Sequence, residues 1–180
     1  VPSPWTRRIR NTNGNRPVIL PGTFKMYCNR EPRFYVSVIF NNEWLNVANR
    51  RVNNLQGVGE DASKSFDAPW TGYNVRKQIS LDVFPRDNKY SYQPGILYRL
   101  AEAYLGYAEA LNELQDSPNE NVYHYVNLIR QRAGIPNLAQ GLSKEQMRAA
   151  IQQERRIEFN CEGIRLNDIR RWKLAEKYLN

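Results

Sequence analysis

The segment 97–114, LYRLAEAYLGYAEALNEL, decides the fold of the second half of this chain. Its apolar residues recur at intervals of three and four, as they do on one face of an α-helix. They are Leu97, Leu100, Ala101, Tyr104, Ala108, Leu111 and Leu114. The repeated alanines add helix propensity. The pattern therefore predicts an amphipathic helix that packs against neighbouring elements.

Start and stop signals predict three further helices after this one. Ser117-Pro118-Asn119-Glu120 offers an N-cap serine, a proline at the first helical position and a capping-box glutamate. Gly134 predicts the end of that helix, and Ser143-Lys144-Glu145-Gln146 is a second capping box. A fourth helix is expected from about Ile164, after a break at Gly163, with an apolar side made of Leu166, Ile169, Trp172 and Leu179. Four such helices with short loops predict an α-helical packing unit.

The first half of the chain has a different texture. Residues 1–96 hold eight of the 10 prolines and thirteen of the 21 aromatic residues, without a helical period. Arg33 to Phe40 is predicted to be a strand, Asn41-Asn42 a turn, and residues 43–47 the returning strand of a short β-hairpin. Another short strand is expected between Gly72 and Val83. We therefore predict a mainly α fold, with an irregular region at 1–96 and four helices at 97–180, forming one folded unit.

Composition excludes several classes of protein. The 180 residues are 41% hydrophobic and 24% charged, values typical of globular domains. No apolar run approaches the roughly 18 residues that a membrane helix needs. Cys28, Cys161 and the single His124 cannot make a disulfide framework or an ordinary zinc site. They also give little basis for Ser-His or Cys-His catalysis, so we expect no metal and no cofactor.

The net charge of +8 raises the possibility of nucleic-acid binding. Residues 1–96 carry +7 of this charge and residues 97–180 carry +1. The arginines of the first half are scattered over irregular segments, and no nucleic-acid-binding motif accompanies them. We therefore expect no nucleic-acid partner.

Carboxylates of the second half also fall at helical spacing. One set is Glu154, Glu158 and Glu162, followed by Arg165, and the other is Glu102, Glu109 and Glu113. They could be catalytic pairs, as in glycoside hydrolysis. They could instead form Arg–carboxylate forks that clamp helices together. The second alternative is favoured, because a segment so rich in arginine keeps its carboxylates ionised.

Three aromatic residues are candidates for ligand binding. Trp44, Trp70 and Tyr73 lie in polar or glycine-rich surroundings, unlike the aromatics of apolar runs. An aromatic ring in a loop can be a flat platform for the C–H face of a sugar, with nearby Asn and Arg as hydrogen-bonding groups. Alternatively, each ring plugs its loop onto the core.

Several segments resemble the SusD/RagB family. They are residues 98–110, 126–136 and 151–172, the last containing ERRIEF and EGIRLNDIRRW, together with 31–34 and 71–77 upstream. The resemblance covers roughly residues 31–180. It implies a largely helical fold with tetratricopeptide-like helices. It also implies that a structural framework is formed by the motif charges Glu102, Glu109, Glu154, Arg155, Glu158, Glu162, Arg165 and Arg171.

The resemblance further implies a function. Members of the family are surface lipoproteins of the outer membrane in Bacteroidetes-type bacteria. They bind glycans or other nutrients for polysaccharide utilization, without catalysis, and sit over a SusC-type TonB-dependent transporter. Members are longer than this chain, and Cys28 is not in a lipoprotein leader. We therefore expect a piece of a lipid-anchored parent protein, itself without the anchor.

The expected function is capture of oligosaccharides for uptake by that transporter. A helical protein–protein interaction scaffold without a small ligand is the main alternative. A glycan-cleaving enzyme is another, and it would need two carboxylates facing a cleft.

Overall fold

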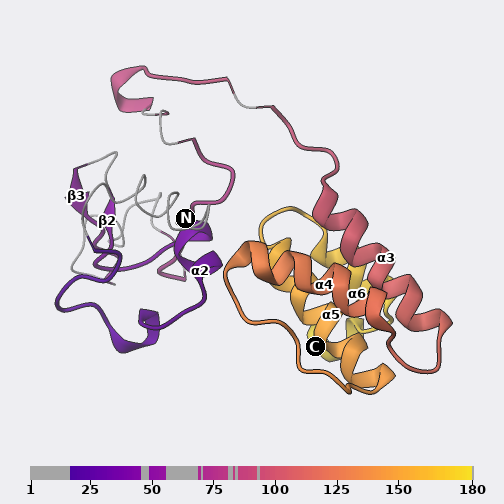
Figure 1. The fold of residues 1–180 in the computed structure, drawn as a ribbon. Helices are drawn as coiled ribbons and strands as arrows, with labels where there is room; N and C mark the ends of the chain where they lie inside the picture. Colours follow the sequence, from indigo (N-terminus) through magenta and orange to yellow (C-terminus); the bar gives the residue numbers. More distant parts are fainter. Residues whose placement is uncertain are drawn as a thin grey trace. The chain divides into compact units, whose positions relative to one another are not determined.

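The computed structural model describes residues 17–45, 49–55, 69, 71–80, 83, 85–92 and 94–179 (Figure 1). The chain divides into two compact units, residues 1–95 and residues 96–180. None of the helices in the described ranges has the length and apolar character needed to cross a bilayer.

The unit at 96–180 is built from five helices (Figure 1). They are α3 (Leu100–Leu114), α4 (Glu120–Ala133), α5 (Lys144–Glu158), α6 (Arg165–Arg171) and α7 (Ala175–Leu179). Helix α3 packs against both α4 and α5. The core between these three helices contains Ala101, Leu105, Ala108, Val122, Tyr123, Val126, Ile129, Met147, Ile151 and Phe159. The predicted helical packing unit is confirmed.

The capping signals of this unit are confirmed in part. Ser143 forms the predicted capping box with Gln146, and Gly134 ends α4 in the left-handed conformation with φ 73°. The expected N-cap at Ser117 is wrong, because Asn119 caps α4 by accepting a hydrogen bond from the Val122 amide at 3.2 Å. Asparagine caps as well as serine does, so the later of the two signals starts the helix.

The predicted apolar face of α3 is wrong in part. Ala101 and Ala108 are buried as expected, but Leu105 and Asn112 complete the buried face, and Leu100 and Leu114 are exposed. Segment 97–114 carries apolar residues on two faces, and the core covers one of them.

The predicted fourth helix is two short ones. It is interrupted at Lys173, whose φ of 56° cannot continue a right-handed helix. Ile169 is buried and Leu166 is exposed, so they do not share an apolar side.

The unit at 1–95 has short elements. They are the 3-10 helices η1 (Lys25–Tyr27) and η2 (Pro85–Asp87), the helix α2 (Pro32–Ser37), and the strands β1 (Val38–Ile39), β2 (Trp44–Leu45), β3 (Arg50–Arg51) and β4 (Asn74–Val75). Strand β1 pairs with β4, and β2 pairs with β3, both antiparallel. The turn at Asn42 is confirmed by its φ of 70°.

The predicted strand from Arg33 to Phe40 is wrong over most of its length. Pro32 occupies the first turn of α2, where its fixed φ favours a helix and its missing N–H is not needed. Of this segment, Val38 and Ile39 form the strand β1, and their partners are Val75 and Asn74. The predicted hairpin between segments 33–40 and 43–47 is therefore replaced by the pair β2–β3.

An aromatic cluster forms the centre of this unit. Phe40 is fully buried, and its ring lies 5.1 Å from that of Tyr27 and 5.5 Å from that of Phe34. Tyr35 packs against the same rings, and its hydroxyl donates to the Tyr27 carbonyl at 2.8 Å. The segment before α2 is thereby attached to the helix.

A buried ion pair joins separate parts of the same unit. Arg76 Nη2 lies 2.6 Å from Glu43 Oε1, and Arg76 Nη1 donates to the Tyr35 carbonyl at 3.0 Å. Glu43 Oε2 accepts from the Phe40 amide at 3.3 Å. Burial raises the pKa of Glu43 to about 7, against the opposing effect of the Arg76 charge. This pair holds the segment after β4 against α2 and the turn before β2.

Candidate functional site

The aromatic residues predicted to bind ligand lie in the unit at 1–95. Trp44 is in β2, half-buried, with Arg51 as its partner in the strand pair. Tyr73 immediately precedes β4 and is also half-buried. Trp70 lies outside the described residues. Trp44 and Tyr73 therefore belong to the same compact unit.

Tyr73 packs its loop onto the aromatic cluster. Its ring stands edge-on to Tyr27, with 5.9 Å between centroids, and its hydroxyl points to Met26 Sδ at 3.9 Å. Burial raises the pKa of Tyr27, and the hydrogen bond with Tyr73 adds to this effect. Tyr73 therefore anchors its loop on the aromatic cluster and still leaves part of its ring to solvent.

Asparagine side chains hold the loops around these rings. Asn42 Oδ1 accepts from exposed Arg51 at 3.2 Å, and Asn42 Nδ2 donates to Thr23 Oγ1 at 3.0 Å. Asn54 Nδ2 donates to the Gly72 carbonyl at 2.9 Å, next to Tyr73. Planar rings with amide and guanidinium groups beside them can stack on a sugar and hydrogen-bond its hydroxyls.

Sequence reasoning missed this asparagine framework. The residues stand in two visible pairs, Asn41-Asn42 and Asn53-Asn54, and only the turn role of the first pair was predicted. The two pairs are also bonded to each other, because the backbone N–H of Asn54 donates to Asn41 Oδ1 at 2.9 Å. This contact joins residues far apart in the sequence, so no local pattern indicates it.

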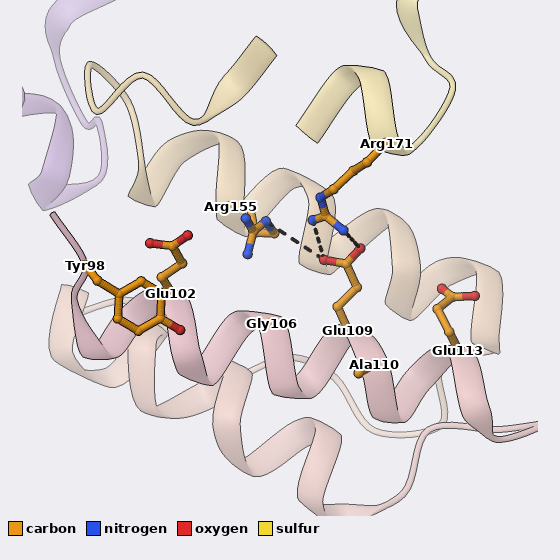
Figure 2. Close-up of a pocket in the computed structure, with 8 residues that line it drawn as sticks. All are labelled: Tyr98, Glu102, Gly106, Glu109, Ala110, Glu113, Arg155 and Arg171. Atoms are coloured by element: carbon orange, nitrogen blue, oxygen red, sulfur yellow. Dashed lines mark hydrogen bonds and ion pairs between the residues drawn. The ribbon is translucent and has the colours of Figure 1, made fainter. Parts of the chain in front are cut away.

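A polar hollow of about 370 Å³ lies in the unit at 96–180 (Figure 2). It lies along α3 and is lined by Tyr98, Glu102, Gly106, Glu109, Ala110, Glu113, Arg155 and Arg171. Figure 2 shows the two arginines reaching from α5 and α6 toward Glu109. The hollow thus lies where three helices present charged side chains.

Two Arg–carboxylate forks form one wall of this hollow. Arg171 Nη2 lies 2.6 Å from Glu109 Oε2, and Trp172 Nε1 donates to Glu109 Oε1 at 2.6 Å. Arg155 is paired with Asp168 at 2.9 and 3.0 Å, and both side chains are buried. These bidentate pairs tie α3 and α5 to α6.

A further fork joins the start of α3 to the end of α5. Arg99, at the start of α3, lies 2.6 Å from Glu158 Oε1 and 2.7 Å from Glu162 Oε2. Its guanidinium also lies 4.7 Å from the centre of the Phe159 ring. Glu158 has a second partner in Arg132 of α4.

The fork interpretation is confirmed for most of the predicted carboxylates. Glu154 pairs with Arg130 at 3.0 Å and Glu113 pairs with Arg148 at 2.6 Å, in addition to the pairs above. Arg165 differs from the expectation, since its guanidinium lies over the Tyr178 ring at 4.8 Å. Glu102 also differs, because its carboxylate has no ion-pair partner among the described residues.

The charge network predicts acid sensitivity through Glu158. Burial opposes ionisation of this carboxyl, but the hydrogen bonds and charges of Arg132 and Arg99 outweigh burial and hold its pKa below the ordinary value. A lowered pKa in the folded state contributes stability at neutral pH that is lost as the pH falls through the folded pKa. The difference in free energy of unfolding between the unsubstituted chain and Glu158→Gln should therefore shrink in acid. Urea unfolding at a series of pH values measures it, and a difference that grows in acid would contradict this assignment.

Metal chemistry has no evident site in the described ranges. No group of three or more His, Cys, Asp and Glu side chains in that part of the chain is placed to hold a metal ion.

Comparison with known proteins identifies the family. A sequence model of the SusD family matches residues 11–180, so the chain belongs to the SusD family. The predicted family and the predicted mainly α fold are both confirmed.

Two curated relatives from Formosa agariphila are similar to part of the chain. They are SusD-like protein P2, 37% identical over 99 residues, and SusD-like protein P25, 35% identical over 97 residues. These matches cover 51% and 52% of the chain, and 19% and 18% of the two relatives. The chain thus matches less than a fifth of the length of either curated relative.

Two solved structures from Bacteroides fragilis share the fold. A SusD-like protein aligns with a TM-score of 0.67 and 36% identity, covering 84% of this chain and 30% of that protein. A SusD-like carbohydrate-binding protein aligns with a TM-score of 0.69 and 23% identity, covering 96% and 36%. The second comparison shows the fold alone.

Proposed function

We propose that this chain is part of a glycan-capture protein that acts at the outer surface of the cell and performs no catalysis. The observation that carries the proposal is the match to the SusD family over residues 11–180. The description of one structural relative as a carbohydrate-binding protein is consistent with it. Glycans or other nutrients are the substrate class.

The ligand face is proposed to include Trp44, Trp70 and Tyr73. The rings of Trp44 and Tyr73 are half-buried and held by their surroundings, which suits stacking, because little side-chain entropy is lost when the sugar binds. The contacts of Tyr73 with Tyr27 and of Asn54 with the Gly72 carbonyl support this pre-organisation. Specificity would then follow from the shape of the face and from its hydrogen-bonding groups.

Native affinity electrophoresis tests the ligand face. The unsubstituted chain should migrate more slowly in a gel that contains at least one of four polymers: starch, xylan, pectin or mucin glycans. We expect the triple variant Trp44→Ala/Trp70→Ala/Tyr73→Ala to bind that glycan at least about tenfold more weakly, because it removes three apolar ring faces that the sugar would bury, at about 25 cal/mol per Å² of apolar surface.

The matched control for this experiment is Tyr92→Ala, which removes an exposed ring from the same unit. This variant should be retained as strongly as the unsubstituted chain. Tyr73→Phe should keep most of the binding, because it preserves the ring against Tyr27. If the triple variant were retained as strongly as the unsubstituted chain, these three residues would not form the ligand face.

We further propose that the captured glycan passes to a SusC-type TonB-dependent transporter in the outer membrane, and that the parent protein is held there by a lipid anchor. Membership of the SusD family supports this partner. Affinity purification of the tagged parent protein from detergent-solubilised outer membranes should recover such a transporter in stoichiometric amount. Recovery of the parent protein alone would count against the partnership.

A further inference from the structure

An exposed arginine lies beside one of the proposed stacking rings. Strands β2 and β3 are paired so that Arg51 is directly opposite Trp44. Residues that oppose each other in an antiparallel pair project their side chains to the same face, with Cβ atoms about 4.5–5.5 Å apart. Arg51 is exposed and Trp44 is half-buried. The guanidinium and the indole therefore belong to one surface of the unit at 1–95.

Asn42 holds this guanidinium in place. Arg51 Nη1 donates to Asn42 Oδ1 at 3.2 Å, and Asn42 Nδ2 donates to Thr23 Oγ1 at 3.0 Å and to the Pro21 carbonyl at 3.2 Å. The segment before η1 thus fixes the Asn42 amide, which fixes the arginine in turn. A guanidinium has five N–H donors in a rigid plane, so Nε and Nη2 remain available to a ligand. Arg51 has no ion-pair partner among the described residues.

The carboxylates that the structure describes in this unit each have a cationic partner of their own. The pairs are Glu31–Arg33 at 2.9 Å, Glu43–Arg76 at 2.6 Å and Asp87–Lys89 at 3.8 Å. Residues 1–96 carry +7 of the net charge, so cations are in excess over the whole of this region. A surface with such an excess attracts anions.

Given the proposed function, on which this inference rests, we propose that the ligand is an acidic glycan. Its carboxylate or sulfate ester groups pair with Arg51 while its sugar rings stack on the aromatic residues of the ligand face. Either group offers two oxygens to the guanidinium fork, and such bidentate, charge-assisted hydrogen bonds are the strong ones. An acidic polymer repeats its charge along the chain, which suits the basic excess of the unit. A neutral glycan would give the same guanidinium only hydroxyl partners.

Polymers that differ only in charge test this substrate class. Isothermal titration calorimetry of the parent protein compares polygalacturonate with fully methyl-esterified pectin, and carrageenan with its desulfated form. At least one acidic polymer should bind about fivefold or more tightly than its neutral counterpart. This preference should fall as NaCl rises from about 0.05 M to about 0.5 M, because salt screens exposed charges. The arm that shows the preference identifies the anion as carboxylate or sulfate.

Variants of Arg51 connect the preference to this residue. Arg51→Gln removes the charge at an exposed position, so the fold should persist and the preference should fall to less than about twofold. Arg51→Lys keeps the charge but loses the fork, and its preference should be intermediate. The matched control is Lys89→Gln, which removes the same charge from a side chain of the same unit that is 69% exposed. It should bind as the unsubstituted protein does.

The outcomes separate this substrate class from the proposed function. Equal binding of the acidic and neutral forms, or a preference that survives Arg51→Gln, would overturn the acidic glycan and leave glycan capture standing. Single-stranded DNA that binds as tightly as the acidic glycan would also overturn it, and would assign the surface to nucleic acid. Absence of binding to every polysaccharide, neutral ones included, would overturn both.

Discussion

Arg155→Met is expected to lower the free energy of unfolding of the helical unit by about 3–5 kcal/mol, because it removes one partner of a buried ion pair. Arg155 and Asp168 are 5% and 3% exposed and are joined by two hydrogen bonds. The same guanidinium lies 3.9 Å from Glu109 and over the Phe159 ring. The substitution would leave the buried Asp168 carboxylate facing Arg171 without its bidentate partner.

Urea unfolding followed by helical circular dichroism measures this loss. The neighbouring Arg156 is exposed on the same helix, so Arg156→Met is the matched control and should change stability by less than about 0.5 kcal/mol. The double variant Arg155→Met/Asp168→Leu should recover much of the loss, because it removes both buried charges together. Equal effects of the two single arginine variants would refute a special role for the buried pair.

Arg76→Met should also destabilise the unit at 1–95, by about 3–5 kcal/mol at a pH well above 7, where the buried Glu43 would have to be ionised without its partner. Arg76 is the cation beside fully buried Glu43, and it also donates to the Tyr35 carbonyl. Without it, the Glu43 carboxyl is buried with less compensation. Its pKa, already about 7, should rise further.

The sign of the pH dependence follows from this shift. A carboxyl whose folded-state pKa lies above its unfolded value binds protons on folding, so its contribution to stability falls as the pH rises between the two values. For Glu43 this range runs from 4.5 to about 7. In Arg76→Met the upper end of this pH range should move to higher pH. The penalty of the variant should therefore be smallest in acid, where Glu43 is protonated in both proteins, and should grow above neutrality.

Tryptophan fluorescence can follow this unit selectively. In a Trp172→Phe background the remaining tryptophans all lie within residues 1–95. Lys89→Met, at an exposed position of the same unit, is the control and should be neutral. A penalty for Arg76→Met that is largest in acid would contradict the assignment of Glu43 as the buried anion.

Helices were predictable from the sequence because their signals are local. The interval of three and four residues in segment 97–114 and the capping box at Ser143 each depend on neighbours within two turns. Arg33 to Phe40 shows where such signals fail. Its aromatic and β-branched residues suit a strand, but Pro32 starts a helix, and the pairing of Val38 with Val75 depends on a distant segment.

The charge network was predictable as a kind of interaction but not as a set of pairs. The excess of arginine among Glu154, Glu158 and Glu162 indicated forks. The pairing of Glu109 with Arg171 joins residues 62 apart, and only the packing of the helices selects it. The lack of an ion-pair partner for Glu102 among the described residues could not be predicted either, because it depends on which arginines pair with the other carboxylates. The aromatic candidates Trp44, Trp70 and Tyr73 remain predictions.

The fork made by Arg99 has a consequence for how the helical unit unfolds. Arrays of stacked helices can lose their repeats one at a time, since each repeat contacts only its neighbours. Arg99 instead connects the first turn of α3 to Glu158 at the end of α5, 59 residues away. Fraying at either end therefore disturbs the other, so α3, α4 and α5 should melt in a single cooperative transition with closely matched amide exchange in all three helices.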